Sequence, residues 1–168
     1  MAEAAKLVNQ ELQLVVFRSG DEEFGVEIGN VQEIIRLTSI TKIPQAGDFI
    51  NGIINLRGRI IVVINLNVVM GIETTVNRDE NARIIVADVG DTVVGFMVDS
   101  VSEVIRLPIK DIEPAPAIIA NRIGTEYLRG VGKMENRLLI LLKLDKILGA
   151  EKLNSIHKIS EETKPEAS

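Results

Sequence analysis

The stretch at residues 52–71 reads GIINLRGRIIVVINLNVVMG, and residues 130–149 read GVGKMENRLLILLKLDKILG. The two segments share a glycine at each end and the pair Arg59 and Arg137, and their apolar positions stay in step throughout. Each holds two apolar runs around a polar turn, which predicts a hairpin, and then a short helical pattern. The chain therefore carries an internal duplication that is built from strands.

The duplication extends toward the N-terminus of each copy. Residues 12–44 reappear about 70 positions later, with about ten identities where chance would give about two; Glu33, for example, returns as Glu103. The offset then grows to about 78, which indicates an insertion in the second copy, at residues 115–129. Two similar halves imply a shared interior and a groove where the halves meet, and we expect the function at that junction.

Composition limits the classes of protein to consider. The chain has 168 residues, 46% of them apolar, which suits one domain or two small fused units with a true core. Its apolar runs are far shorter than the roughly 20 residues of a membrane-spanning helix, and its first residues lack the layout of a secretion signal. With no cysteine and a net charge of −5, we expect a cytoplasmic protein that does not bind nucleic acid.

Strands dominate the predicted elements. The expected strands of the first copy are 12–18, 24–28, 31–37 and the two arms of a hairpin at 50–66, and those of the second include 83–89, 92–98 and 101–107. Segments 31–37 and 101–107 also have apolar residues at i, i+3 and i+4, which is ambiguous between helix and strand. We favour strand, with a short helical turn at its start.

Turns and helices complete the pattern. The first hairpin turn includes Arg57, Gly58 and Arg59, and Glu135 and Asn136 occupy the second. Short helices are expected at 65–71 and 143–149 and a terminal helix at 151–160. In the first of these, Asn65 can cap the start; Gly71 and Gly149 can stop the two short helices.

These elements predict an all-β fold with short helices. About ten short strands favour two five-stranded barrels. The runs RIIVVI and RLLILL do not alternate, so their strands should be covered on both faces, at an apolar seam between the halves. We assign 12–153 to one domain, with 12–71 as first and 82–149 as second repeat and barrel, although duplicated units can exchange strands. Residues 72–81 read as a linker, and 1–11 and 161–168 as flexible termini.

The sequence contains no credible set of catalytic residues. The pairs Asp91-Thr92 and Asp99-Ser100 resemble the aspartic protease motif, but valine follows where glycine should, and both pairs lie in one repeat. His157 is the only histidine, and we expect it to be an exposed surface residue. We therefore predict no enzyme activity, no metal and no cofactor.

Phosphate, calcium and base-stacking sites are also disfavoured. In GVGKM, residues 130–134, methionine follows the lysine where a phosphate loop needs Ser or Thr. The acidic clusters at 21–23 and 78–80 lack the ligand spacing of a calcium loop. One Tyr and no Trp leave few platforms for bases. What remains is a duplicated β scaffold whose function is recognition, as in an adaptor.

Three segments carry a resemblance to a known family. They are GDEEFGVEIGNVQEI (20–34), INLRGRI (54–60) and TEYLRGVG (125–132), and they closely resemble the CheW-like family of chemotaxis coupling proteins over residues 12–153. The resemblance implies two SH3-like five-stranded barrels with an apolar seam, and no cofactor. It implies a coupler, monomeric alone, that links methyl-accepting chemotaxis receptors to the histidine kinase CheA and reaches the membrane only through receptor arrays.

The resemblance also implies two binding surfaces. The receptor's helical tip would dock in a groove between the barrels, which would include Ile28, Val31, Glu33, Ile34, Val98 and Val101. The kinase's own CheW-like domain would dock on Ile43, Pro44, Asn55, Leu56, Arg57, Gly58 and Arg59. Glu33 would supply a rim charge and Arg57 the main kinase contact. Two alternatives stay open: the five apolar groove residues can be plain core, and Arg57 can bond the hairpin to its own barrel.

The copies differ at the hairpin, and other functions stay open. The first copy has Leu-Arg-Gly-Arg where the second has Met-Glu-Asn-Arg, so only the first should make the hairpin-dependent contact. One alternative function is a CheW-like scaffold in a non-chemotactic motility or signalling pathway. The other is a barrel that binds a small ligand or hydrolyses a substrate.

Overall fold

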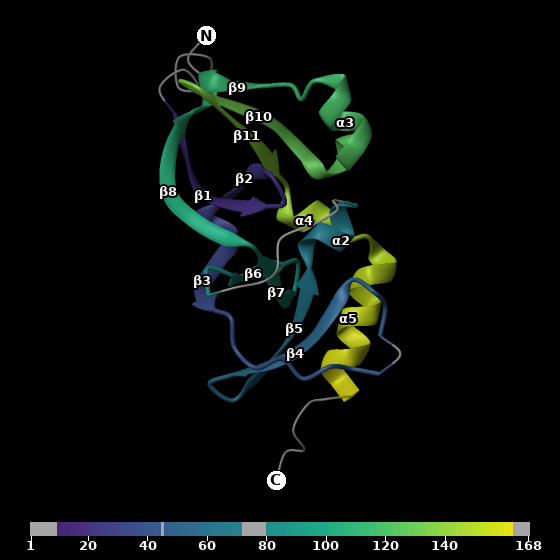
Figure 1. Cartoon of the computed structure of the whole chain (residues 1–168). Coiled ribbons are helices and arrows are strands. Elements are labelled where there is room, and N and C mark those ends of the chain that lie inside the picture. Colours follow the sequence, from purple (N-terminus) through teal and green to yellow (C-terminus); the bar gives the residue numbers. More distant parts are fainter. Residues whose placement is uncertain (1–9, 45, 72–79, 163–168) are drawn as a thin grey trace.

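Two curled sheets, one above the other, form the body of the molecule (Figure 1). The computed structural model describes residues 10–44, 46–71 and 80–162. The predicted all-β class with short helices is confirmed, and the sheets are two SH3-like barrels. Within the described residues no helix is long and apolar enough to cross a membrane.

Within the described residues the barrels hold eleven strands, where about ten were expected. The first barrel contains β1 (Glu11–Ser19), β2 (Glu22–Glu27), β8 (Ser100–Pro108), β9 (Ile112–Glu113), β10 (Leu128–Met134) and β11 (Arg137–Leu142), in the order β8-β1-β2-β11-β10-β9. The second contains β3 (Val31–Arg36), β4 (Ile50–Leu56), β5 (Arg59–Asn65), β6 (Arg83–Val89) and β7 (Thr92–Val98), in the order β3-β6-β7-β5-β4. The short strand β9 gives the first barrel six strands rather than five.

The two copies exchange strands. Strand β8, from the second copy, pairs with β1 in the first barrel, while β3, from the first copy, pairs with β6 in the second barrel. Parallel pairs of β2 with β11 and of β5 with β7 also join the copies. Residues 12–71 and 82–149 therefore each contribute strands to both barrels, so neither repeat is a barrel by itself.

Three apolar clusters make up the core. Ile61 and Val63 of β5 face the interior of the second barrel, whereas Val62 and Ile64 belong to a larger cluster between the barrels, which we call the seam cluster. Strand β11 repeats this pattern, with Leu139 and Leu141 inside the first barrel and Ile140 and Leu142 in the seam cluster. The non-alternating runs are thus covered on both faces, which confirms the apolar seam.

Short helices connect and cover the strands. They are η1 (Ile28–Asn30), α2 (Leu66–Met70), η2 (Ile109–Asp111), α3 (Ala117–Ile123), η3 (Thr125–Tyr127), α4 (Leu144–Ile147) and α5 (Ala150–Glu162). Asn65 caps α2 by accepting a 3.1 Å hydrogen bond from the amide of Asn67, and Gly71 ends α2 in a left-handed conformation, as predicted. Segments 31–37 and 101–107 are strands, and the helical turn η1 stands just before β3.

Three expectations about where elements begin and end need correction. Gly149 does not end α4, because the backbone of Leu148 is already extended. The carbonyl of Gly149 instead accepts a hydrogen bond from the amide of Leu153 in α5. Residues 161 and 162 are part of α5 rather than of a flexible terminus, and Glu11 begins β1. The rest of the expected termini, at 1–9 and 163–168, and most of the expected linker, at 72–79, lie outside the described residues.

The insertion of the second copy forms a helix that the sequence pattern did not predict. Its helix α3 is followed by η3, and two arginines fasten the segment to β2. Arg122 lies 2.7 Å from Glu22, and Arg129 pairs with Glu27. Since both acids stand on the first copy, the insertion adds a further link between the copies.

Two equivalent glycines allow the strands to bend. Gly52 and Gly130 lie at register shifts of β4 and β10 and have φ near +147° and +146°. A Cβ on Gly130 would stand 2.5 Å from the carbonyl oxygen of Glu113, and one on Gly52 would meet the carbonyl of Thr41. Only glycine fits here, because both the backbone conformation and the space exclude a side chain.

We expect Gly130→Ala to lower the free energy of unfolding by about 2 kcal/mol or more, since strain and contact act together. Urea unfolding followed by circular dichroism measures the change. Gly29→Ala is the matched control, because a Cβ at Gly29 meets nothing within 4 Å. A Gly130→Ala variant as stable as the control would contradict the bend that we describe.

Candidate functional site

Strands β3 and β8 are equivalent in the two copies, and both are bulged. A register shift separates Val31 from Glu33 in the pairing with β6, and another lies between Val16 and Phe17 in the pairing of β1 with β8. Each bulge puts residues three positions apart on the same face of the strand. The i, i+3 spacing that is ambiguous in the sequence therefore belongs to a bulged strand.

The shared face of these strands points to the seam. Val31 and Ile34 stand opposite Ala87 and Ile85 of the seam cluster. Val101 and Val104 stand opposite Phe17 and Val15 of the same cluster. Cross-strand neighbours lie on one face of a sheet. We call Val31, Ile34, Val101 and Val104 the seam face.

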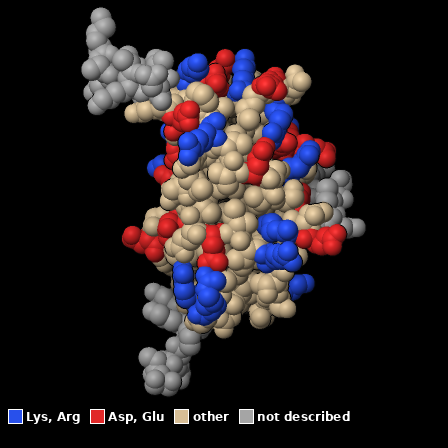
Figure 2. Space-filling view, turned by 90° about the vertical axis from the view of Figure 1, so that its left-hand side faces the viewer, with Lys and Arg blue, Asp and Glu red and all other residues tan. Residues whose placement is uncertain are grey.

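The seam face is open to a partner. Val31, Ile34 and Val101 are half-buried, and Val104 is 52% exposed. Figure 2 shows the side of the molecule on which β3 and β8 lie, with a largely uncharged band across its waist and charges above and below. An uncharged band that is bordered by charge suits an apolar partner.

The other two predicted groove residues differ from each other. Ile28 is 37% exposed in η1, whereas Val98 is fully buried in the seam cluster. Val98 cannot touch a partner, because core packing uses its whole side chain. For Val98 the alternative of plain core is the correct one.

Glu33 lies on the opposite face of β3 from Val31 and Ile34. Its cross-strand neighbour is Val86, whose side chain belongs to the interior of the second barrel. There its carboxylate pairs with the guanidinium of Arg57 on the β4–β5 hairpin. Glu33 is thus engaged with the hairpin rather than placed on the rim of the seam face.

The β4–β5 hairpin presents a polar tip. Arg57 and Gly58 are the two central residues of the turn, both with positive φ, and Arg59 already belongs to β5. The side-chain oxygen of Asn55 accepts a 2.8 Å hydrogen bond from the amide of Gly58. Asn55, Arg57, Gly58 and Arg59 are exposed, and the side chain of Arg57 is 68% exposed despite its ion pair.

Two of the three apolar members of the predicted kinase surface face inward. Leu56 packs against the interior cluster of the second barrel, and Ile43 packs against the seam cluster. Pro44 is exposed. The preceding Thr41 exchanges two 2.9 Å backbone hydrogen bonds with Ile53 of β4. Segment 41–44 is therefore anchored along β4, while the exposed tip is polar.

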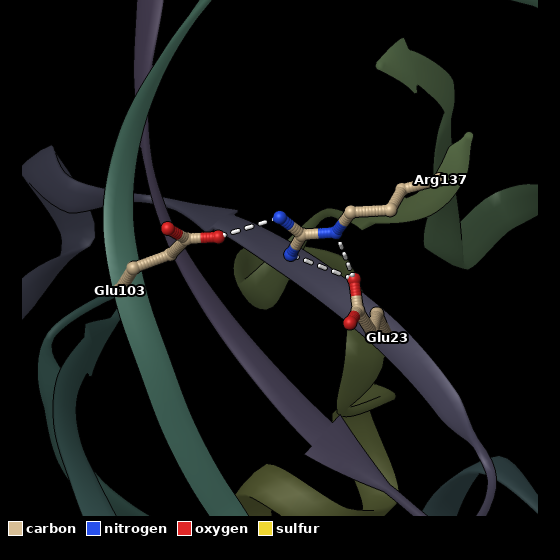
Figure 3. Close-up of polar contacts among 3 residues, drawn as sticks. All are labelled: Glu23, Glu103 and Arg137. Atoms are coloured by element: carbon tan, nitrogen blue, oxygen red, sulfur yellow. Dashed lines mark hydrogen bonds and ion pairs between the residues drawn. The ribbon is translucent and has the colours of Figure 1, made fainter. Parts of the chain in front are cut away.

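A second ion-pair cluster stands on the first barrel. Arg137, at the start of β11, bonds Glu103 of β8 at 2.7 Å and Glu23 of β2 at 2.8 Å (Figure 3). These hydrogen bonds, first that to Glu103 and then that to Glu23, raise the pKa of Arg137 above its ordinary value. One guanidinium therefore joins three strands.

Two residues of β8 were not predicted from the sequence: Val104 of the seam face and Glu103 of the Arg137 cluster. Val104 and Glu103 stand 70 positions after Ile34 and Glu33, so the duplication itself could have identified them. The pattern alone gave no reason to extend the groove along β8 past Val101.

Structural partners engage three of the residues considered for catalysis: Thr92, Asp99 and His157. A carboxylate oxygen of Asp99 accepts a 2.8 Å hydrogen bond from the amide of Gly20 in the β1–β2 turn. His157 is exposed on α5, as expected, but its Nε2 lies 2.7 Å from the hydroxyl of Thr92. Within the described part of the chain, no three His, Cys, Asp or Glu residues gather as metal ligands.

Comparisons with known proteins agree with this architecture. The family model described as the CheW-like domain matches residues 13–152. The chain is 40% identical to the chemotaxis protein CheW of Klebsiella aerogenes, over 94% of this chain and 92% of that protein. It is 37% identical to CheW of Rhizobium meliloti, over 90% of this chain and 97% of that protein.

A solved structure is similar along most of the chain. It is the crystal structure of the scaffolding protein TtCheW from Thermoanaerobacter tengcongensis, with a TM-score of 0.76 and 36% identity. The alignment covers 85% of this chain and 91% of that chain.

Proposed function

This chain belongs to the CheW-like domain family, and from that premise we propose that it is a non-catalytic chemotaxis adaptor. It couples methyl-accepting chemotaxis receptors to the histidine kinase CheA. The observation that carries the proposal is the pair of surfaces on one molecule, an open apolar seam face and a polar hairpin tip.

The seam face fits the helical tip of a receptor. An amphipathic helix binds in an apolar trough through side chains at i, i+3 and i+4. Two bulged strands that each present a pair of branched apolar residues match such a helix, and Val104 is the most exposed of the four. The partner helix buries apolar area on both sides, which supplies the main part of the affinity.

The hairpin tip fits the kinase's own CheW-like domain. A planar guanidinium can donate paired hydrogen bonds to a carboxylate or to backbone carbonyls. Arg57 is exposed enough to do so while one of its nitrogens stays with Glu33. Because Glu135 takes its place in the second copy, the two hairpins offer opposite charge.

The Glu33–Arg57 pair gives the adaptor a route for coupling. Glu33 lies on β3 between Val31 and Ile34, and its partner Arg57 lies on the hairpin. A receptor that changes the position of β3 therefore changes the geometry of the kinase contact. Coupling requires a different interaction free energy in each receptor state, and no covalent bond is made or broken.

Titration of the chain against a receptor cytoplasmic fragment and against CheA tests the proposal. Native chain should bind each partner and should hold both in one complex, which size-exclusion chromatography with light scattering detects. If neither partner binds at tens of micromolar, which corresponds to a binding free energy of about −6 kcal/mol, the assignment of this chain to chemotaxis is wrong. A CheW-like scaffold in another signalling pathway then becomes the better reading.

We expect Arg57→Ala to weaken CheA binding about tenfold, about 1.4 kcal/mol, and to leave the fold intact, since exposed ion pairs contribute at most about 1 kcal/mol. Isothermal titration measures the affinity. Glu33→Gln is the matched variant, because it breaks the ion pair and keeps the arginine. Equal losses in both variants would show that Arg57 acts only by holding β3.

A further inference from the structure

The seam face has two walls: the β3 wall, made of Val31 and Ile34, and the β8 wall, made of Val101 and Val104. We propose that Arg137 is a positioning residue that fixes the β8 wall, so that both of its valines are already in place when a receptor helix arrives. That the wall receives a receptor helix rests on the proposed function. That Arg137 fixes the wall rests on geometry alone.

The geometry holds a strand at the edge of its sheet. Strand β8 is the end member of its sheet, bonded on one side to β1. Arg137 reaches it from β11 with a 2.7 Å bond to Glu103, while its other nitrogens lie 3.0 and 2.8 Å from Glu23. Figure 3 shows the guanidinium between the two carboxylates. Strand β8 is hydrogen-bonded to only one neighbouring strand of its sheet, and the bond from Arg137 gives it a second attachment.

The attachment lies at the level of the seam face. Glu103 stands between Val101 and Val104 along β8, and its cross-strand neighbour Val16 belongs to the interior of the first barrel. The carboxylate and the two valines therefore lie on opposite faces of one bulged segment. Fixing Glu103 sets the twist of that segment and, with it, the direction of both valines.

The charges make the arrangement depend on Arg137. Glu23 and Glu103 face the same guanidinium, with side chains 22% and 42% exposed. Without the guanidinium, two carboxylates would face each other at partial burial and would repel. The repulsion would act between β2 and β8, and the edge strand β8 is the one that can move.

The duplication shows that this attachment is specific to one wall. By the offsets of the two copies, Arg59 corresponds to Arg137 and Val93 corresponds to Glu23. Without a second acid, Arg59 only approaches Gln32, at 3.4 Å. The β3 wall is instead held by Arg57 at the exposed hairpin tip.

The residues of the seam face on β8 are thus attached to the first barrel through Arg137, and those on β3 are linked to the kinase surface through Glu33 and Arg57. A receptor helix can brace against the β8 wall and displace the β3 wall. This division would direct the response toward the hairpin.

Arg137→Met tests the proposal, because it keeps most of the side-chain length and removes the charge. Arg122→Met is the control, since Arg122 bonds Glu22 on the same strand as Glu23 at 2.7 Å but does not reach β8. We expect amide hydrogen exchange of residues 101–105 to rise at least tenfold in Arg137→Met. Receptor affinity should fall about tenfold, while CheA affinity stays within twofold. Arg122→Met should change none of these.

Glu103→Gln provides a milder second variant, which keeps Arg137 on Glu23 and should move exchange and receptor affinity in the same direction. Unchanged exchange in β8 for both variants would overturn the proposal. So would a joint loss of receptor and CheA binding with reduced circular dichroism, since that marks general unfolding. If native chain binds no receptor, the proposed function fails, but β8 exchange still tests the role of Arg137.

Discussion

Val104→Glu is expected to weaken receptor binding by two orders of magnitude or more while leaving the chain folded. Val104 is 52% exposed in the free chain, so a carboxylate there stays hydrated and costs the fold little. A bound apolar helix would cover it, and an uncompensated buried charge costs about 3 kcal/mol or more, which is about a hundredfold in affinity. Titration with a receptor cytoplasmic fragment measures the loss.

The control for Val104→Glu is the same substitution on another side of the molecule. Ile118 in α3 is 73% exposed, and α3 lies across the molecule from β8 in Figure 1. Ile118→Glu should leave receptor affinity within about threefold. If Val104→Glu binds as well as the native chain, the receptor helix does not use the seam face, and that part of the proposal is wrong.

The sequence predicts the parts of this fold that depend on repetition and period. Matched copies indicated two barrels, and the unbroken apolar run at 60–64 indicated a strand covered on both faces. The structure explains that run, because alternate residues face the barrel interior and the seam cluster. The side chains of this strand do alternate between its two faces, but both faces are apolar, so the alternation does not appear as a hydrophobic–polar pattern in the sequence.

Tertiary pairing decides what the sequence does not. The bulge in β3 depends on its pairing with β6, more than 50 residues away in the chain, and it reverses the face that Glu33 occupies. The same local sequence therefore predicts a rim charge where the structure has an ion pair with the hairpin tip on the opposite face of β3. Likewise, Val98 sits in a strand whose two faces are covered, which no local pattern distinguishes from a groove wall.

The last expectation concerns the seam itself. We expect Phe96→Ala to lower the free energy of unfolding by about 3–5 kcal/mol, since it empties a large site in a packed cluster. Phe96 is fully buried on β7 of the second barrel and shares the seam cluster with Phe24 of the first. A domain with a total stability of about 5–15 kcal/mol loses a large fraction of it. Phe96→Leu, which fills most of the space, should cost clearly less than Phe96→Ala, because it leaves a smaller cavity.

The position of the only tyrosine makes the experiment sharper. Tyr127 lies just before β10 of the first barrel and packs against the seam cluster, and the chain has no tryptophan, so tyrosine fluorescence reports on the seam next to the first barrel. Circular dichroism reports on both barrels. Because exchanged strands and one seam join the barrels, both probes should give a single shared transition in urea, and Phe96→Ala should shift both equally. Separate transitions would mean that the barrels unfold independently, which would contradict a seam that joins the two barrels into one cooperative unit.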